Sequence, residues 1–111
     1  SAVPDSLREN FSRMSEVCLA MIRLANQSLK DRDAVAALRM AEIDHEMDHL
    51  RRDHFGVLLG ENWSGSVEQA IDVALLGRYF ERFADHAVAV ARRVIYIITG
   101  QFPEGEEWPN A

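Results

Sequence analysis

Apolar residues recur at alternating spacings of three and four between residues 71 and 100. The positions in this pattern are Val73, Leu76, Phe80, Phe83, Ala87, Val90, Val94 and Ile97. Because an α-helix turns once every 3.6 residues, this spacing gathers the side chains into one stripe along a helix. Nothing interrupts the pattern, so it predicts a single long helix that packs this stripe inside a helical bundle.

Two acids lie on another side of this predicted helix. Glu81 and Asp85 are one turn apart and project about 150° around the helix from the middle of the apolar stripe. The neighbours of the two acids are small or apolar: Ala74, Gly77, Ala84 and Val88. A solvated face normally carries more polar side chains than this. We therefore interpret the acidic face as a surface that something else covers.

Two further helices are expected before this one. The first covers residues 5–28, with apolar positions at Leu7, Phe11, Met14, Cys18, Met21 and Ala25. The second covers residues 32–59, with one face made of Ala36, Met40, Ile43, Met47, Leu50, His54, Val57 and Leu58. Asp31 or Asp33 can cap its first turn, because either carboxylate can accept a hydrogen bond from a free backbone amide. We expect His54 to be a hydrogen-bonded core residue.

The third helix has its own start and stop signals. A loop over residues 60–65 precedes it, and Ser64 or Ser66 can cap it, with Glu68 placed to help. Gly100 ends it, and no strand pattern occurs elsewhere. The sequence therefore predicts an all-α fold, a single up-down-up antiparallel three-helix bundle over residues 1–100. An irregular tail is expected over residues 101–111.

Composition narrows the classes of function. A chain of 111 residues forms one domain by size, and a formal net charge of −6 argues against nucleic acid as a partner. The single cysteine, Cys18, excludes an intrachain disulfide and fits a reducing compartment. No apolar run approaches the roughly 18 residues of a membrane-spanning helix, and no signal peptide is evident. These features favour a cytoplasmic protein.

The second predicted helix repeats the acidic spacing of the third, since Asp44 and Asp48 are also one turn apart. Two carboxylates at this spacing repel each other and destabilise an isolated helix by about 0.2–0.5 kcal/mol. Two such pairs on neighbouring helices call for positive partners. One possibility is arginine, because Arg78 and Arg82 are near Asp85, and Arg51 is near Asp48. The other is a metal ion held by carboxylate oxygens. From spacing alone, ion pairing is the commoner explanation.

Patterns typical of catalytic sites are weak in this sequence. The segments from Glu42 to His45 and from Glu46 to His49 match the Glu-x-x-His spacing of di-iron bundles. Three of these four side chains, Glu42, His45 and His49, are expected to point away from the apolar face, whereas a di-iron site needs them inside. No nucleophile stands next to a plausible base and no glycine-rich phosphate loop occurs. These patterns therefore identify no catalytic site.

The sequence of the third predicted helix resembles the signature of a known protein family. Residues 78–82 (RYFER), 84–87 (ADHA) and 94–100 (VIYIITG) are similar to the signature of the PhoU family of phosphate-signalling proteins. The family usually has glycine where this chain has Ala84. Residues 44–50 (DHEMDHL) resemble the family's acidic element on the preceding helix. Together these segments and the helices that carry them cover about two thirds of the chain.

The resemblance implies a fold and a function. Family members are all-helical tandem repeats of three-helix bundles, and the ending of this chain looks like that of the C-terminal repeat. They are non-enzymatic negative regulators of phosphate-starvation signalling and phosphate uptake. Their partners are a sensor histidine kinase and the ATP-binding subunit of the phosphate transporter, so they meet the membrane only through these partners. A half-length chain is either a piece of a longer protein or pairs with a second copy to rebuild the tandem, and we expect a homo-oligomer.

The resemblance also implies a cofactor. Paired acidic motifs of the family bind metal, with iron or zinc as the expected ion. Carried over by position, the expected ligands are Asp44, Asp48, Glu81 and Asp85. Groups that can support them are Arg78, Arg82 and His86.

Overall fold

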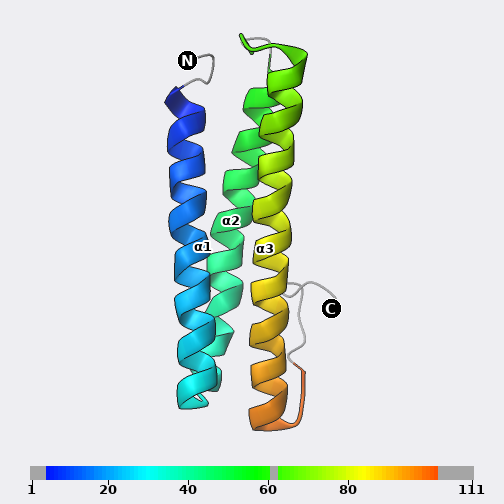
Figure 1. Cartoon of the computed structure of the whole chain (residues 1–111). Helices are drawn as coiled ribbons and strands as arrows, with labels where there is room; N and C mark the ends of the chain where they lie inside the picture. Colours follow the sequence, from blue (N-terminus) through cyan, green and yellow to red (C-terminus); the bar gives the residue numbers. More distant parts are fainter. Residues whose placement is uncertain (1–4, 61–62, 103–111) are drawn as a thin grey trace.

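Three helices form an elongated bundle that measures 50 × 22 × 18 Å (Figure 1). The computed structural model describes residues 5–60 and 63–102. Helix α1 covers Asp5–Asp31, α2 covers Ala34–Leu59 and α3 covers Val67–Thr99. They run up, down and up beside one another, which confirms the predicted fold class. Among the described residues, none of the helices is long and apolar enough to span a membrane.

The helix ends follow from local hydrogen bonds. Asp33 is the cap of α2, since its carboxylate accepts hydrogen bonds from the backbone amides of Val35 and Ala36 at 3.0 and 3.1 Å. The other candidate, Asp31, is the last residue of α1, which therefore runs three residues further than the apolar pattern indicates. Gly100 ends α3 with a φ of 78°, a left-handed conformation that glycine adopts without strain.

The start of α3 differs in one partner from the sequence prediction. Ser66 caps the helix, and Gln69 rather than Glu68 completes the capping box by accepting a hydrogen bond from the Ser66 amide at 2.7 Å. Of the predicted irregular tail, Gln101 and Phe102 are described and are not helical. Phe102 stacks on Tyr96 with ring centroids 4.5 Å apart. The remainder of the tail lies outside the described residues.

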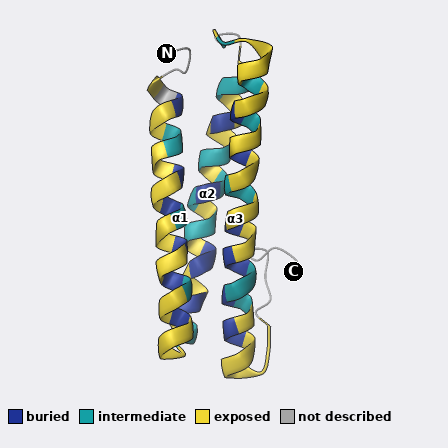
Figure 2. Cartoon of the chain, viewed as in Figure 1, coloured by how far each residue is buried: buried dark blue, intermediate teal, exposed yellow. Residues whose placement is uncertain are grey.

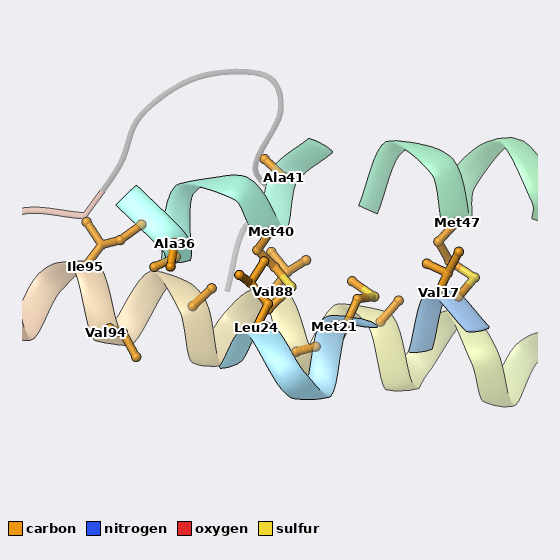
Figure 3. Packing of buried hydrophobic residues seen from close by; sticks show 14 of the residues in the cluster. Val17, Met21, Leu24, Ala36, Met40, Ala41, Met47, Val88, Val94 and Ile95 are labelled. Atoms are coloured by element: carbon orange, nitrogen blue, oxygen red, sulfur yellow. The ribbon is translucent and has the colours of Figure 1, made fainter. Parts of the chain in front are cut away.

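The core runs along the line where the three helices meet (Figure 2). Figure 3 shows Leu24 of α1, Met40 of α2 and Val88 of α3 meeting at its centre. The predicted apolar faces of α1 and α2 are the buried ones: Leu7, Met14, Met21, Ala36, Met40 and Met47 are all at most 4% exposed. For these two helices, the pattern of apolar residues identified the core correctly.

The predicted stripe of α3 is wrong at several positions. Leu76, Phe83 and Ile97 are 45%, 41% and 66% exposed, although the pattern placed them in the core. The prediction is confirmed at Val73, Ala87 and Val94, which are buried. The other buried positions of α3 are mostly small side chains: Gly77, Ala84, Val88, Ala91 and Ile95. Small side chains allow the backbones of neighbouring helices to approach closely. The smooth surface beside the acids is thus covered by the rest of the bundle itself.

Candidate functional site

The predicted acids come from the two helices α2 and α3, which pack side by side. Asp44 is half-buried, and Asp85 on α3 and Asp48 on α2 are near enough to act on its charge. Burial first, and then the negative charges of Asp85 and Asp48, raise the pKa of the Asp44 carboxyl from its ordinary 3.8 to about 6. The structure therefore brings Asp44, Asp48 and Asp85 into one acidic region across the boundary between α2 and α3.

Glu81 has a different environment, because arginine already compensates its charge. Arg51 of α2 forms an ion pair with Glu81 of α3, and Arg78 pairs with the other carboxylate oxygen. Arg51 also lies 3.5 Å from Asp48, which in turn lies 3.3 Å from Arg52. The Arg51 guanidinium thus connects the acidic pairs of the two helices. Spacing along one helix identified its contact with Asp48 but not its contact with Glu81.

The three predicted supporting residues lie in different places. Arg78 contacts Glu81 rather than Asp85. Arg82 and His86 line a groove between α1 and α3, together with Cys18 and Phe83. This groove has a volume of about 1010 Å³, and none of the described residues that line it is an acid. The apolar periodicity of α3 did not indicate the groove, because it placed Leu76 and Phe83 inside the core.

The acidic region has donors that suit a hard cation, since carboxylate oxygens are the preferred ligands of such ions. In the described ranges, however, no three side chains of the His, Cys, Asp or Glu type stand close enough together to hold a metal ion. Asp44 and Asp85 repel each other, and Glu81 is occupied by Arg51. The donors therefore fit a cation in chemistry, and Glu81 would have to exchange Arg51 for it.

The histidines and acids of the Glu-x-x-His segments behave as expected. Glu42, His45 and His49 are exposed. Glu46 accepts hydrogen bonds from Arg13 of α1, one of them at 2.9 Å, and this contact joins α1 to α2. The arrangement matches a solvated face and not an inward-facing di-iron site.

His54 is buried as predicted, but it lacks the expected hydrogen bond. Its side chain is 0% exposed, and neither ring nitrogen makes a hydrogen bond of ordinary geometry. Burial and, to a smaller extent, the charge of Arg51 lower the pKa of the imidazole, while the backbone of Val73 acts in the opposite direction. The ring packs edge-on against Phe11 and Phe55, with centroid distances of 5.0 and 5.5 Å. His54 is therefore a neutral core residue.

These features define an all-helical bundle that carries carboxylates on two adjacent helices. The family model described as PhoU domain matches residues 11–94. The chain therefore belongs to the PhoU family, in agreement with the resemblance of the third helix. No solved structure matches the chain significantly.

The three relatives compared below share the description of a phosphate-specific transport system accessory protein. The chain is 41% identical over 109 residues to "Phosphate-specific transport system accessory protein PhoU homolog 1" of Mycobacterium leprae, covering 98% of this chain and 49% of the relative. It is 42% identical over 102 residues to homolog 2 of Mycobacterium tuberculosis, covering 92% and 48%. A homologue from Zymomonas mobilis is 34% identical over 94 residues, covering 82% and 40%. The chain thus spans about half the length of the curated relatives it matches, or less.

Proposed function

We propose that this chain is a regulatory accessory component of phosphate-specific transport. The observation that carries the proposal is the identity of 41% to 42%, over nearly the whole chain, with proteins named as accessory proteins of that system. Each relative is about twice as long, so the role attributed to it extends to this chain only as a proposal. That the chain has no enzymatic activity is a prediction from the family resemblance.

The proposed partners are a sensor histidine kinase and the ATP-binding subunit of a phosphate transporter, which the chain meets in the cytoplasm to repress phosphate-starvation signalling. The test is expression of the chain in a mycobacterial strain that lacks its own PhoU homologues. A phosphate-starvation reporter should be active at high phosphate in that strain, and the chain should lower it. A reporter that stays active, with the chain present and folded, would contradict the proposal.

The proposed cofactor is iron or zinc at Asp44, Asp48, Glu81 and Asp85. The proposal is supported by the acidic region that Asp44 shares with Asp48 and Asp85, and by the side-by-side placement of their helices. Binding would bring a positive charge to the carboxylates that now repel each other, and Glu81 would leave Arg51. The bound ion would supply charge compensation and a rigid link between α2 and α3.

Elemental analysis tests this cofactor. The protein is purified with and without iron or zinc in the medium, and compared with a Glu81→Gln/Asp85→Asn double variant. Metal at a stoichiometric amount in the parent chain, and a loss of most of it in the folded double variant, is the expected result. An unchanged metal content in the variant would remove these acids from the site.

A second candidate is a structural interaction module whose acids only form ion pairs. The contacts of Arg51 with Glu81 and Asp48, and of Arg78 with Glu81, favour it. Chelation separates the two candidates. If a chelator affects neither the thermal midpoint nor the binding of the transporter subunit, the metal has no role, and the structural interaction module is the supported candidate.

A further inference from the structure

An exposed apolar stripe runs along α3 on the side away from its buried face. Ile71, Leu75, Tyr79 and Phe83 are 55%, 57%, 76% and 41% exposed, and each follows the previous one after four residues. Figure 2 shows that exposed residues predominate along the first half of α3. Contiguous large apolar side chains on a surface mark an interaction site more often than single ones do. We call these four residues the outer stripe.

The outer stripe adjoins the groove between α1 and α3. Phe83 and Tyr79 belong to both, and Leu19 and Ile22 form the far wall of the groove on α1. A groove of about 1010 Å³ has room for several large side chains from an opposing helix. Stable interfaces bury about 800 Å² on each partner, so a contact along one helix gains area if neighbouring side chains enter this groove.

Charged residues flank the outer stripe with opposite signs at its two ends. The exposed acids Glu68 and Asp72 accompany its first half, and the exposed Arg82 and His86 accompany its second half. Within the part of the chain that the structure describes, Glu68, Asp72 and Arg82 form no ion pair. The helix therefore offers an acidic end and a basic end on one face, with an apolar centre.

These positions are arranged symmetrically about Gly77. Pairs of residues at equal distances on either side of it are complementary: Asp72 with Arg82, Glu68 with His86, Ile71 with Phe83, and Leu75 with Tyr79. In an antiparallel contact between two identical helices, a two-fold axis that crosses their exposed faces at the level of residue 77 places such pairs opposite each other. A parallel contact would place acid against acid and base against base, which is unfavourable.

We propose that this outer face of α3 binds a second copy of the chain, antiparallel, around a two-fold axis that crosses the outer stripe between Leu75 and Tyr79, at the level of the buried Gly77. Asp72 of one copy then meets Arg82 of the other, and Glu68 meets the His86 imidazole, which can donate a hydrogen bond to it. The apolar centre joins Ile71 to the second copy's Phe83 and Leu75 to its Tyr79. This surface is distinct from the acidic region, which faces α2, so the dimer does not depend on a bound metal.

A charge-swap cycle tests the dimer. Sedimentation equilibrium of the chain, in chelator at pH 7.5, is measured for the parent, Asp72→Arg, Arg82→Asp and the double variant. Each single swap creates two repulsive contacts per dimer and should raise the dissociation constant about tenfold. The double variant should return to within about threefold of the parent, because each pair is restored with reversed signs.

Glu42→Arg on α2 is the matched control, since it makes a similar change at an exposed site away from α3. It should leave the dissociation constant unchanged, and circular dichroism should show the same helix content in every variant. A parent chain that stays monomeric at millimolar concentration would overturn the proposal. Single swaps that leave dimerisation unchanged, or a double variant no better than either single one, would also overturn it.

Disulfide trapping tests the orientation. In a Cys18→Ser background, Glu68→Cys and His86→Cys variants are oxidised separately and as a mixture. In the antiparallel dimer the two copies of residue 68 lie about 27 Å apart along the axis, so neither variant should cross-link alone. The mixture should give a covalent dimer. Cross-linking of each variant with itself would show a parallel contact and contradict the proposed symmetry.

Discussion

Gly77 of α3 lies directly against the buried ring of His54 on α2. A Cβ atom at position 77 would stand 2.6 Å from Nε2 of His54 and 3.0 Å from Cδ2. The ring is fixed between Phe11 and Phe55, so it has little room to withdraw. Glycine at this position therefore determines how closely α2 and α3 pack, beside the acids that both helices carry.

Gly77→Ala should destabilise the bundle although alanine favours helix. The gain in helix propensity is about 1 kcal/mol, and overpacking costs about 1–3 kcal/mol, so we expect a net loss measurable by urea unfolding. Gly56→Ala is the control, since its Cβ would contact nothing within 4 Å. It should stabilise by about 0.5–1 kcal/mol. A Gly77→Ala effect that persists unchanged in a His54→Ala background would exclude the proposed clash.

His54 should make stability fall as the pH drops below the ordinary histidine value. Its pKa is lowered in the folded protein, so below about pH 6.5 the unfolded chain binds a proton that the native chain does not. The loss is at most about 1.4 kcal/mol per pH unit. His54→Leu should lack this contribution, and should be as stable as the parent or more so at pH 7.5, because two unsatisfied nitrogens are removed.

The measurement for His54 is urea unfolding of the parent and His54→Leu at pH 7.5 and pH 5.5. Comparing the two proteins at each pH cancels the contributions of all other titrating groups. An equal difference between them at both pH values would show that His54 is protonated alike in the native and unfolded chains.

The contribution of Asp44 to stability depends on pH in the opposite direction to that of His54. Its pKa is raised to about 6 from 3.8, so its contribution to stability is fully present below about pH 3.8 and is lost as the pH rises through 6. Above that pH, Asp44→Asn should stabilise the metal-free protein. The full shift corresponds to about 3 kcal/mol, and because the side chain is only partly buried we expect about 1 kcal/mol.

The gain from Asp44→Asn should be present at pH 7.5 and nearly absent at about pH 3.5, below the ordinary pKa of 3.8, where Asp44 is mostly protonated in the native and the unfolded chain alike. Asp53→Asn is the control, an exposed acid on the same helix. Thermal melts in chelator at the two pH values provide the comparison. A stabilisation of equal size at both pH values would point to a cause other than charge.

Arg51 and Arg52 are adjacent arginines with different expected effects. The Arg51 side chain is 22% exposed and contacts both Asp48 and Glu81. The Arg52 side chain is 72% exposed, and Asp48 is its one acidic partner among the described residues. Arg51→Gln should destabilise by about 1–3 kcal/mol, since it leaves a partly buried carboxylate without one of its partners. Arg52→Gln should cost about 0.5 kcal/mol or less.

The same pair of variants informs the proposed metal site. If a cation replaces Arg51 at Glu81, Arg51→Gln removes a competitor and should raise the affinity for iron or zinc about tenfold. Isothermal titration with zinc compares the two variants with the parent. A decrease in affinity for Arg51→Gln would mean that Arg51 supports the bound state instead of competing with it.

The sequence predicted the three helices, a cap of α2 at Asp31 or Asp33, and the buried faces of α1 and α2, because the Leu and Met residues that recur there at helical spacing are the ones the bundle buries. For α3 the sequence was right at Val73, Ala87 and Val94 and wrong at Leu76, Phe83 and Ile97, because this helix is apolar on more than one side. There the periodicity alone favours the larger side chains of Leu76 and Phe83, whereas the bundle packs the smaller ones, including Gly77 and Ala84. The choice depends on how closely α2 can approach, and spacing within one helix does not contain that information.

The same limit applies to the acidic region. Spacing identified the two acidic pairs and the contact of Arg51 with Asp48, because these lie on single helices. The contact of Arg51 with Glu81 joins two helices, and it requires the rotation of each helix about its own axis. Once α3 is rotated to bury its small residues, Glu81 meets α2, and Arg82 and His86 meet the groove beside α1.

The connection between α1 and α2 consists of only two residues, Arg32 and Asp33. Arg32 has a φ of 49°, a left-handed conformation, and the Asp33 amide donates a hydrogen bond to the Ser28 carbonyl at 3.1 Å. Closing so short a loop costs little chain entropy, whereas α3 follows a longer connection. The pair α1–α2 is therefore expected to assemble first during folding, with α3 docking afterwards. Stopped-flow measurements should then show Met40→Ala slowing folding, and Val88→Ala mainly speeding unfolding.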